Sequence, residues 1–332
     1  MPIYTLDVCI VPKVEKKQYD VGAADGSVVY AVEAAKAMEN NKWVVDDDKQ
    51  KQEQLALIVE NQRLYNNVYG ESNRLSDTEK DIYKKISMPI AYQIYKKSII
   101  FDLVSVQTFL GPCSTLRFEN TDGELRQTEW LAKTRALKAR WNFDSMQDLK
   151  MSCGLDPVVE LILILAQDIS LEITREILQD LRNNALRISF ENKYGLRAVE
   201  KTSKIIESRI GHEANWIVAG DSEGGLLEQI ENSSDFEPDA EFTKYSFGVT
   251  KMGRLSGKWD IYRDPLYPAD QFLMGFKGNN YQAGYFYGPY VALVPTPVAL
   301  DPDNFVPRRG LLHRYGKRLE NKDYYASVKL ER

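Results

Sequence analysis

The longest regular pattern in the chain covers residues 156–184, where apolar side chains recur every three or four positions. Charged and amide residues separate the members of this apolar stripe, which are Val158, Ile162, Leu165, Ile169, Ile173 and Ile177. Such spacing predicts one amphipathic helix with a single buried face. Asp156 can cap the first amides and Pro157 suits a first turn, so we expect the helix to begin there. At about 1.5 Å per residue it would run roughly 40 Å, the span of a small domain.

Shorter helical patterns lie on both sides of this helix. They cover residues 50–67, 77–86, 144–150, 199–210 and 221–230. The second follows a Ser-x-x-Glu capping spacing, and the fourth is followed by a glycine, which often ends a helix. The polar residues 231–244 after the last helix predict a loop.

Strand patterns dominate the remainder of the chain. We expect extended segments or strands at residues 3–14, 114–119, 124–130, 133–140, 215–219, 257–262, 272–276, 284–294, 311–318 and 324–330. The second and third flank Asp122-Gly123, a pair that favours a tight hairpin turn. The sequence therefore predicts an α+β protein with helices in the middle and strands at both ends.

Basic side chains alternate with apolar ones over residues 133–140. On a strand, the basic residues Lys133, Arg135, Lys138 and Arg140 would not all share one face, yet their spacing is not random. This pattern favours a charged surface that faces a partner.

Composition limits the class of protein. With 332 residues and 43% hydrophobic content, the chain can bury a full core in one large or two ordinary domains. The net charge of −5 argues against wrapping of nucleic acid by a basic surface. Cys9, Cys113 and Cys153 lack paired spacing, which favours reduced thiols. No secretory signal or membrane-length apolar run is visible, so we expect an intracellular product without a membrane partner.

Several motifs that are similar to catalytic or ligand-binding sites have simpler interpretations. Gly220-Asp-Ser-Glu-Gly-Gly225 is similar to a serine protease motif, but Glu223 interrupts it, and Asp221 or Ser222 would cap a helix equally well. His212 and His313 lack neighbours at metal-ligand spacing and are expected at the surface or an interface. Gly275-Phe-Lys-Gly278 lacks the residues of a phosphate-binding loop. We therefore predict no catalytic residue, no cofactor and no metal site.

Two further clusters concern packing and charge. Tyr281, Tyr285, Phe286, Tyr287 and Tyr290 form an aromatic block that favours core or interface packing over base stacking. The densest basic cluster consists of Arg308, Arg309, His313, Arg314, Lys317 and Arg318. It could contact DNA, but pairing with Glu320 or with carboxylates of an adjacent subunit is the favoured interpretation.

Several blocks, in a consistent order, resemble the major capsid proteins of T-even-like tailed bacteriophages, which have the HK97-like fold. The resemblance covers roughly residues 90–330. Its blocks are Ile99-Ile-Phe-Asp-Leu-Val-Ser-Val-Gln107, Lys133-Thr-Arg-Ala-Leu-Lys-Ala-Arg-Trp-Asn-Phe-Asp-Ser-Met-Gln-Asp-Leu149, Ala166-Gln-Asp-Ile-Ser-Leu-Glu-Ile-Thr-Arg-Glu176, Asn215-Trp-Ile-Val-Ala219, Gly257-Lys-Trp-Asp-Ile-Tyr-Arg-Asp264, Gly275-Phe-Lys-Gly278, Ala283-Gly-Tyr-Phe-Tyr-Gly-Pro-Tyr-Val-Ala-Leu293 and Asp301-Pro-Asp-Asn-Phe305.

The resemblance implies a domain plan. Residues 1–90 would form an N-terminal arm, and residues 91–194 part of a peripheral domain. The latter would include an extended loop at about residues 112–132 and the long helix as its spine. Residues 195–297 would form mainly the axial domain, and residues 298–332 would return to the peripheral domain. The family's large insertion domain has no room between Phe118 and Trp130.

The resemblance also implies a structural function. The chain would self-assemble into homo-pentamers and homo-hexamers of an icosahedral head, contact packaged DNA without sequence specificity, and reside in the virion after assembly in the host cytoplasm. Portal, scaffold, and decoration or cement proteins are further candidate partners. The expected subunit-interface residues are Ile3, Leu6, Val8, Asp122, Gly123, Lys133, Arg135, Lys138, Arg140, Arg308 and Arg309. Alternatives are a vertex paralogue, an encapsulin-like compartment shell, or a soluble α+β enzyme.

Overall fold

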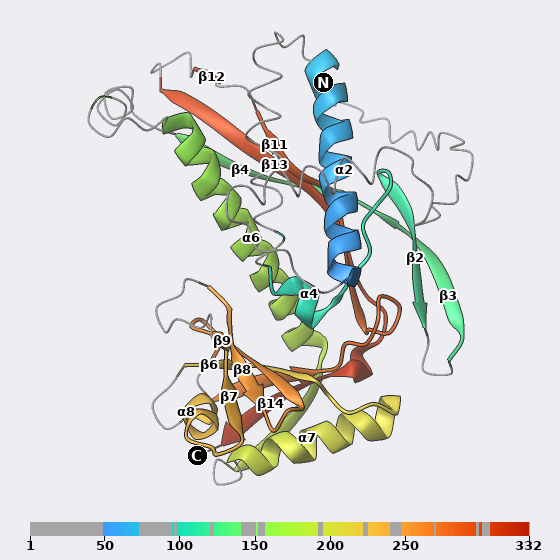
Figure 1. The fold of residues 1–332 in the computed structure, drawn as a ribbon, viewed down its shortest axis with the longest axis vertical. Coiled ribbons are helices and arrows are strands. Elements are labelled where there is room, and N and C mark those ends of the chain that lie inside the picture. Colours follow the sequence, from blue (N-terminus) through green and yellow to red (C-terminus); the bar gives the residue numbers. More distant parts are fainter. Residues whose placement is uncertain are drawn as a thin grey trace, which may run out of the picture.

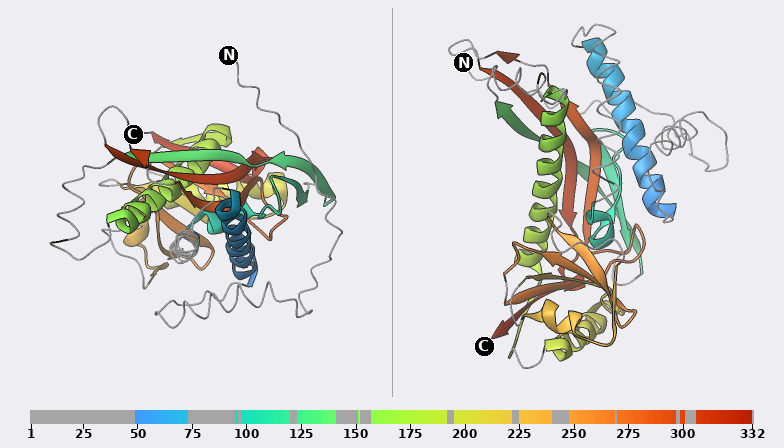
Figure 2. Two further views of the ribbon diagram at one scale, coloured as in Figure 1. Left: turned by 90° about the horizontal axis from the view of Figure 1, so that it is seen from above. Right: turned by 60° about the vertical axis from the view of Figure 1, so that its left-hand side comes forward.

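The computed structural model describes residues 49–72, 95, 98–119, 123–140, 151, 157–191, 195–221, 225–239, 248–268, 270–296, 299–300 and 306–331. The segments predicted at residues 3–14, 77–86 and 144–150 lie outside these ranges. Within them the molecule is elongated, with one sheet at each end and a long helix running between the two (Figures 1 and 2).

The long helix is α6, Pro157–Asn184, and its prediction is confirmed. Leu165, Ile169, Ile173 and Ile177 are each no more than 7% exposed, so the part of the apolar stripe whose side chains the structure describes is the buried face. The helix runs from the five-stranded sheet to the seven-stranded sheet (Figure 2). It therefore acts as the spine of the described fold.

A five-stranded sheet lies along the upper part of α6. Its strands are β1 (Ser105–Val106), β11 (Tyr285–Pro295), β13 (Pro307–Leu319), β12 (Ala299–Leu300) and β4 (Lys133–Arg140), in the order β1-β11-β13-β12 with β4 paired to β13. The helix α2 (Lys49–Ser72) packs beside β11 and contributes Leu55 and Ile58 to the same buried cluster as α6. Tyr287 and Tyr315 from the sheet complete this cluster.

The seven-stranded sheet forms the other end of the molecule. Its order is β5 (Leu186–Glu191), β14 (Tyr325–Glu331), β10 (Gln271–Gly275), β6 (Trp216–Gly220), β9 (Trp259–Asp264), β8 (Thr250–Leu255) and β7 (Phe236–Pro238). The helices α7 (Gly195–Ile210) and α8 (Leu226–Glu231) pack on one face around a second buried cluster. Trp216 and Leu273 on the other face join the cluster of α6. The core is therefore continuous between the two sheets.

A separate two-stranded sheet projects from the body (Figure 1). It is the expected hairpin, formed by β2 (Cys113–Glu119) and β3 (Leu125–Leu131) in antiparallel register. The short elements α4 (Ile100–Leu103) and η2 (Lys322–Tyr324) connect the larger ones.

The structure corrects the predicted arrangement in several places. α7 begins at Gly195 rather than at residue 199, and α8 at Leu226 rather than at residue 221. Residues expected to be a loop include β7, which pairs with β8. Its Pro238 is tolerated because an edge strand does not need every amide. Helices and strands also alternate along the middle of the chain, with β5 between α6 and α7 and β6 between α7 and α8.

Candidate functional site: a projecting hairpin and the basic strand that continues it

The base of the hairpin is fixed to the body by aromatic packing. The indole of Trp130 stacks on the ring of Phe109 with 4.6 Å between centroids. Leu116 and Phe286 are fully buried in the same cluster. Because Trp130 and Leu116 come from the two strands, this cluster holds both strands at once. The base of the hairpin is therefore rigidly oriented.

Beyond this base the hairpin is open to solvent. The side chain of Leu125, at the turn end of β3, is 65% exposed, and that of Leu131, at the base beside Trp130, is 61% exposed. Gly123, near the turn, has a φ of +77°, which favours glycine because other side chains strain in that region. A two-stranded ribbon is marginally stable without support from another surface. Leu125 therefore presents apolar surface to solvent on this ribbon.

The strand β4 continues from the hairpin and pairs with β13 along its whole length. Leu137 and Ala139 pack against the main core, so side chains at odd positions face α6. Lys138 and Arg140 occupy the opposite face and are exposed. The mixed basic pattern thus resolves into two faces of one strand.

Like charges meet where β4 pairs with β13. Arg140 lies directly opposite Arg308, and Lys138 lies opposite Gly310. Arg309 turns away and donates from Nε to the carbonyl of Thr296 at 2.8 Å. Like charges directly opposite each other on paired strands destabilise the pairing.

On the inner face, α6 supplies carboxylates to the sheet. Lys317 Nζ lies 2.7 Å from Glu176 Oε1 and also pairs with Asp180. The guanidinium of Arg135 and the hydroxyl of Tyr315 bind the same Glu176 carboxylate. Burial alone would raise the pKa of Glu176, but Lys317, Tyr315 and Arg135 together hold it below its usual value. We call these side chains the charged seam.

The charged seam extends to β11. The hydroxyl of Tyr285 donates to Asp180 Oδ2 at 2.8 Å. Burial, reinforced by the Asp180 carboxylate, raises the pKa of Tyr285. Side chains from α6, β4, β11 and β13 therefore meet in one hydrogen-bonded network, which fixes the spine helix against the sheet.

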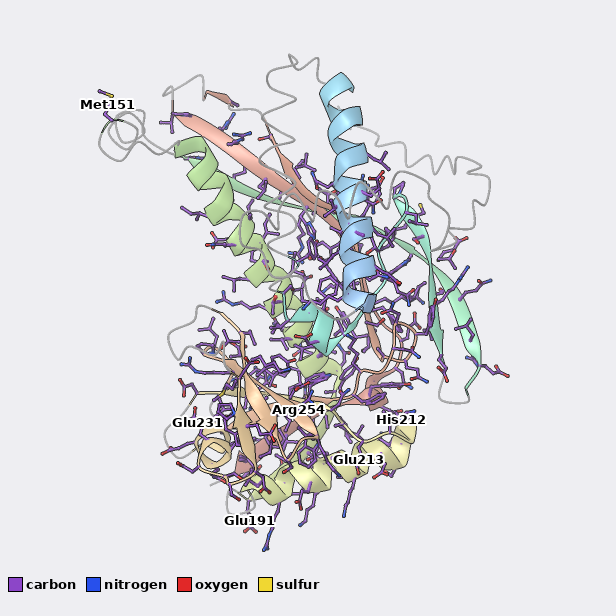
Figure 3. The ribbon with its side chains drawn as sticks, viewed as in Figure 1. Met151, Glu191, His212, Glu213, Glu231 and Arg254 are labelled. Atoms are coloured by element: carbon purple, nitrogen blue, oxygen red, sulfur yellow. The ribbon has the colours of Figure 1, made fainter. Side chains whose placement is uncertain are left out.

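His313 lies inside the core rather than at a surface or interface, so that expectation is wrong. It is 1% exposed, and its Nδ1–H donates to the carbonyl of Ala292 at 2.7 Å. The other ring nitrogen of the neutral imidazole accepts from hydroxyls, with Tyr287 at 3.0 Å and Tyr95 at 3.2 Å. Burial lowers the pKa of His313 to about 4. By contrast His212 is exposed, at the end of α7 (Figure 3).

The remaining candidate motifs have structural roles. Asp221 accepts a hydrogen bond from Arg263 at 2.9 Å, while α8 begins after Gly225 without a side-chain cap, so Asp221 does not cap this helix. Ser222 lies outside the described residues. Across the described ranges, no three His, Cys, Asp or Glu side chains converge as metal ligands. None of the described helices combines the length and hydropathy that a bilayer crossing requires.

The aromatic block and the basic cluster are mostly accounted for within the chain. Tyr285, Phe286 and Tyr287 are buried, as expected for core packing, whereas Tyr281 is 42% exposed. Arg318 pairs with Glu320, the acidic neighbour named from the sequence.

The predicted interface residues divide into three groups. Ile3, Leu6, Val8 and Asp122 lie outside the described residues. Arg135 and Arg309 make contacts within the chain, to Glu176 and to the carbonyl of Thr296, although the Arg135 side chain remains 52% exposed. Gly123, Lys133, Lys138, Arg140 and Arg308 are exposed. Sequence reasoning missed the acceptors of the charged seam. Glu176 and Asp180 are four residues apart beside the apolar stripe, and this spacing places both on one side of a helix.

Solved structures with the same arrangement of elements define the fold. A phage-related protein from Bordetella bronchiseptica RB50 matches with a TM-score of 0.50 and 8% identity, over 74% of this chain and 96% of the other. The capsid of an empty GTA particle matches with a TM-score of 0.50 and 11% identity, over 71% and 90%. The fold is the HK97-like capsid fold.

The family follows from the sequence match. The model of the family described as major capsid protein Gp23 matches residues 117–331, and the chain belongs to this family. The major capsid protein of Enterobacteria phage T4 is 31% identical over a 220-residue alignment that covers 56% of this chain and 42% of the relative. The protein of Vibrio phage KVP40 is 28% identical over the same shares. The chain thus spans less than half the length of these curated relatives.

Proposed function

We propose that this chain is a structural shell protein that self-associates into pentamers and hexamers of a phage head and carries out no catalysis. The observation that carries the proposal is the match to the major capsid protein family over residues 117–331, which include the spine helix and every strand of the two large sheets except β1. The projecting hairpin supports it, because a ribbon with exposed leucines gains stability when a neighbouring copy covers it.

For the domain plan, we propose boundaries that follow which of the two large sheets each strand belongs to. We assign α6 with the five-stranded sheet to the peripheral domain and the seven-stranded sheet with α7 and α8 to the axial domain. The segment 298–332 is then shared, because β13 belongs to the first sheet and β14 to the second. The hairpin corresponds to the extended loop, and residues 1–90 to the N-terminal arm.

The proposed contact surfaces are the hairpin and the outer face of β4. Gly123 and Leu125 would lie against a neighbouring subunit, and Lys138, Arg140 and Arg308 would meet its carboxylates. Ile3, Leu6, Val8 and Asp122 remain proposed contacts from the sequence. The assembled shell would enclose DNA without sequence specificity, be built in the host cytoplasm, and recruit portal, scaffold and decoration or cement proteins.

Electron microscopy of the purified full chain tests this function. Under assembly conditions, negative-stain images should contain closed shells of uniform diameter, or regular pentamers and hexamers. A small discrete oligomer at every protein concentration and salt condition would contradict the proposal.

A further inference from the structure

The hairpin strand β2 has one side of its backbone outside the two-stranded ribbon. Among the described strands it pairs only with β3. The amide and the carbonyl of Arg117 point away from β3, because both bond to a side chain outside the hairpin. Backbone groups at such an edge need partners, and those partners fix the direction of the strand.

The side chain of Gln107 binds this edge. Its Oε1 accepts from the amide of Arg117 at 3.1 Å, and its Nε2–H donates to the carbonyl of Arg117 at 2.5 Å. A primary amide that bonds to both backbone groups of one residue imitates the peptide of a neighbouring strand. The backbone of Gln107 is itself fixed, because its amide donates to the carbonyl of Tyr287 in β11 at 2.9 Å. Gln107 therefore joins the hairpin to the five-stranded sheet.

The connector between β10 and β11, residues 276–284, joins the two large sheets. The side chain of Asn215, just before β6, bonds to the amide and the carbonyl of Lys277 at 3.0 and 2.6 Å. Lys277 Nζ in turn donates to the carbonyl of Phe101 in α4. These bonds fix the connector against the seven-stranded sheet and against α4.

The middle of the connector is bonded to the same edge of the hairpin. Gln107 Nε2 also donates to the carbonyl of Asn280 at 2.8 Å, and the hydroxyl of Ser105 donates to the same carbonyl at 2.5 Å. The carbonyl of Tyr281 accepts from the amide of Glu119 in β2 at 2.9 Å. The strand β2 is therefore held to the connector both directly and through Gln107.

We propose that Gln107 is a positioning residue for assembly, which sets the direction of the hairpin before a neighbouring copy binds it. A ribbon already held in its bound direction loses less conformational freedom on association, so the contact forms at lower protein concentration. The inference rests on the proposed shell function, because the partner of the hairpin is another copy of the chain.

Gln107→Glu tests the bonds to the hairpin with a side chain of the same size. It keeps an oxygen for the amide of Arg117, but it places an ionised oxygen against the carbonyls of Arg117 and Asn280 in place of the N–H donors. In the unassembled full chain, amide hydrogen exchange over residues 113–119 should become about tenfold faster, as measured by mass spectrometry. Gln107→Ala removes the same donors without adding charge and should change exchange in the same direction.

Gln127→Ala is the matched control. Gln127 lies opposite Arg117 on β3 and is exposed, so the substitution removes an amide from the hairpin without touching the bonds of Gln107. Its exchange over residues 113–119 should match that of the unchanged protein. An equal acceleration in Gln127→Ala, or unchanged exchange in both Gln107 variants, would overturn the proposal.

Assembly and folding are then measured on the same variants. If only about a tenth of the chains hold the hairpin in its bound direction, the critical concentration for shell formation should rise about tenfold in both Gln107 variants. Their unfolding temperatures should stay close to that of the unchanged protein, because the stack of Trp130 on Phe109 still anchors the base of the hairpin. Faster exchange with an unchanged critical concentration would overturn the positioning role. A critical concentration that rises only in step with a falling unfolding temperature would overturn it as well.

The two proposals can fail separately. Shells of the unchanged protein support the shell function whatever the Gln107 variants do. If the unchanged protein never forms shells, the shell function fails, and the exchange measurement alone decides whether Gln107 sets the direction of the hairpin.

Discussion

Leu125 offers a direct test of the hairpin as a subunit contact. Its side chain is 65% exposed in the single chain. Leu125→Ala removes about three carbon groups, worth about 0.8 kcal/mol each when fully buried, or about 2.4 kcal/mol in all. If a neighbouring copy covers the exposed 65%, the variant loses about 1.5 kcal/mol per contact, or about tenfold in affinity.

The assay separates assembly from folding. The critical concentration for shell formation, followed by light scattering and sedimentation, should rise by about tenfold or more in Leu125→Ala. The free energy of unfolding of the unassembled chain should change by less than about 0.5 kcal/mol, since the site is exposed. Leu266→Ala is the matched control, because Leu266 is 66% exposed but lies far from the hairpin in sequence, in the turn after β9.

Two results would refute the reasoning. An unchanged critical concentration in Leu125→Ala would mean that no neighbour covers the hairpin. An equal rise in Leu266→Ala would mean that any exposed leucine has the same effect, so the hairpin would have no special role.

Three further predictions concern the core and the charged seam. Trp130→Ala should lower the free energy of unfolding by about 3–5 kcal/mol, because it removes the stack on Phe109. Urea denaturation measures this change, and a loss below about 1 kcal/mol would contradict the anchoring role. Glu176→Gln should lower the free energy of unfolding by about 1–3 kcal/mol, since Lys317 and Arg135 lose a charged acceptor. An unchanged unfolding midpoint would contradict the stabilising role of the charged seam. The pKa of His313 is about 4 in the folded chain, below its value of about 6.5 in the unfolded chain. Between these pH values only the unfolded chain binds the proton. The free energy of unfolding should therefore fall by about 3 kcal/mol as the pH drops from 6.5 to 4. Unfolding at both pH values should show His313→Leu to be less pH-dependent by about one proton, and an identical pH slope would disprove this role.

Much of the fold could be predicted because its signals are local. The apolar stripe of α6 repeats with the period of a helix, and the burial of Ile169 and Ile173 follows from it. Asp122-Gly123 located the hairpin turn because few residue pairs accept that backbone. The register itself, with Ser114 opposite Trp130, comes from the structure.

The charged seam could be predicted only in part. Lys133–Arg140 was recognised as a basic strand, but its two faces were not separated. Arg135 and Lys317 are distant in sequence, and only the pairing of β4 with β13 brings them to the same carboxylate. The sequence shows which residues of this strand are charged, but it does not show which strand pairs with it.

His313 shows the same limit in the core. A lone histidine in a basic cluster indicates an exposed site, yet the alternation of β13 turns it toward α6, between Tyr95 and Tyr287. A strand's period decides which residues share a face, but not which face is covered.

By itself, the sequence determined the spine helix, the hairpin, most of the strands and the resemblance to capsid proteins, because periodicity and turn chemistry act over a few neighbouring residues. Only the tertiary structure decided that β14 joins the seven-stranded sheet, that α6 supplies the acceptors for Arg135 and Lys317, and that β5 is left at an edge. Apart from the Arg135–Glu176 pair, these features depend on contacts between segments more than 100 residues apart. Burial of a common core selects such contacts, and no local sequence pattern predicts them.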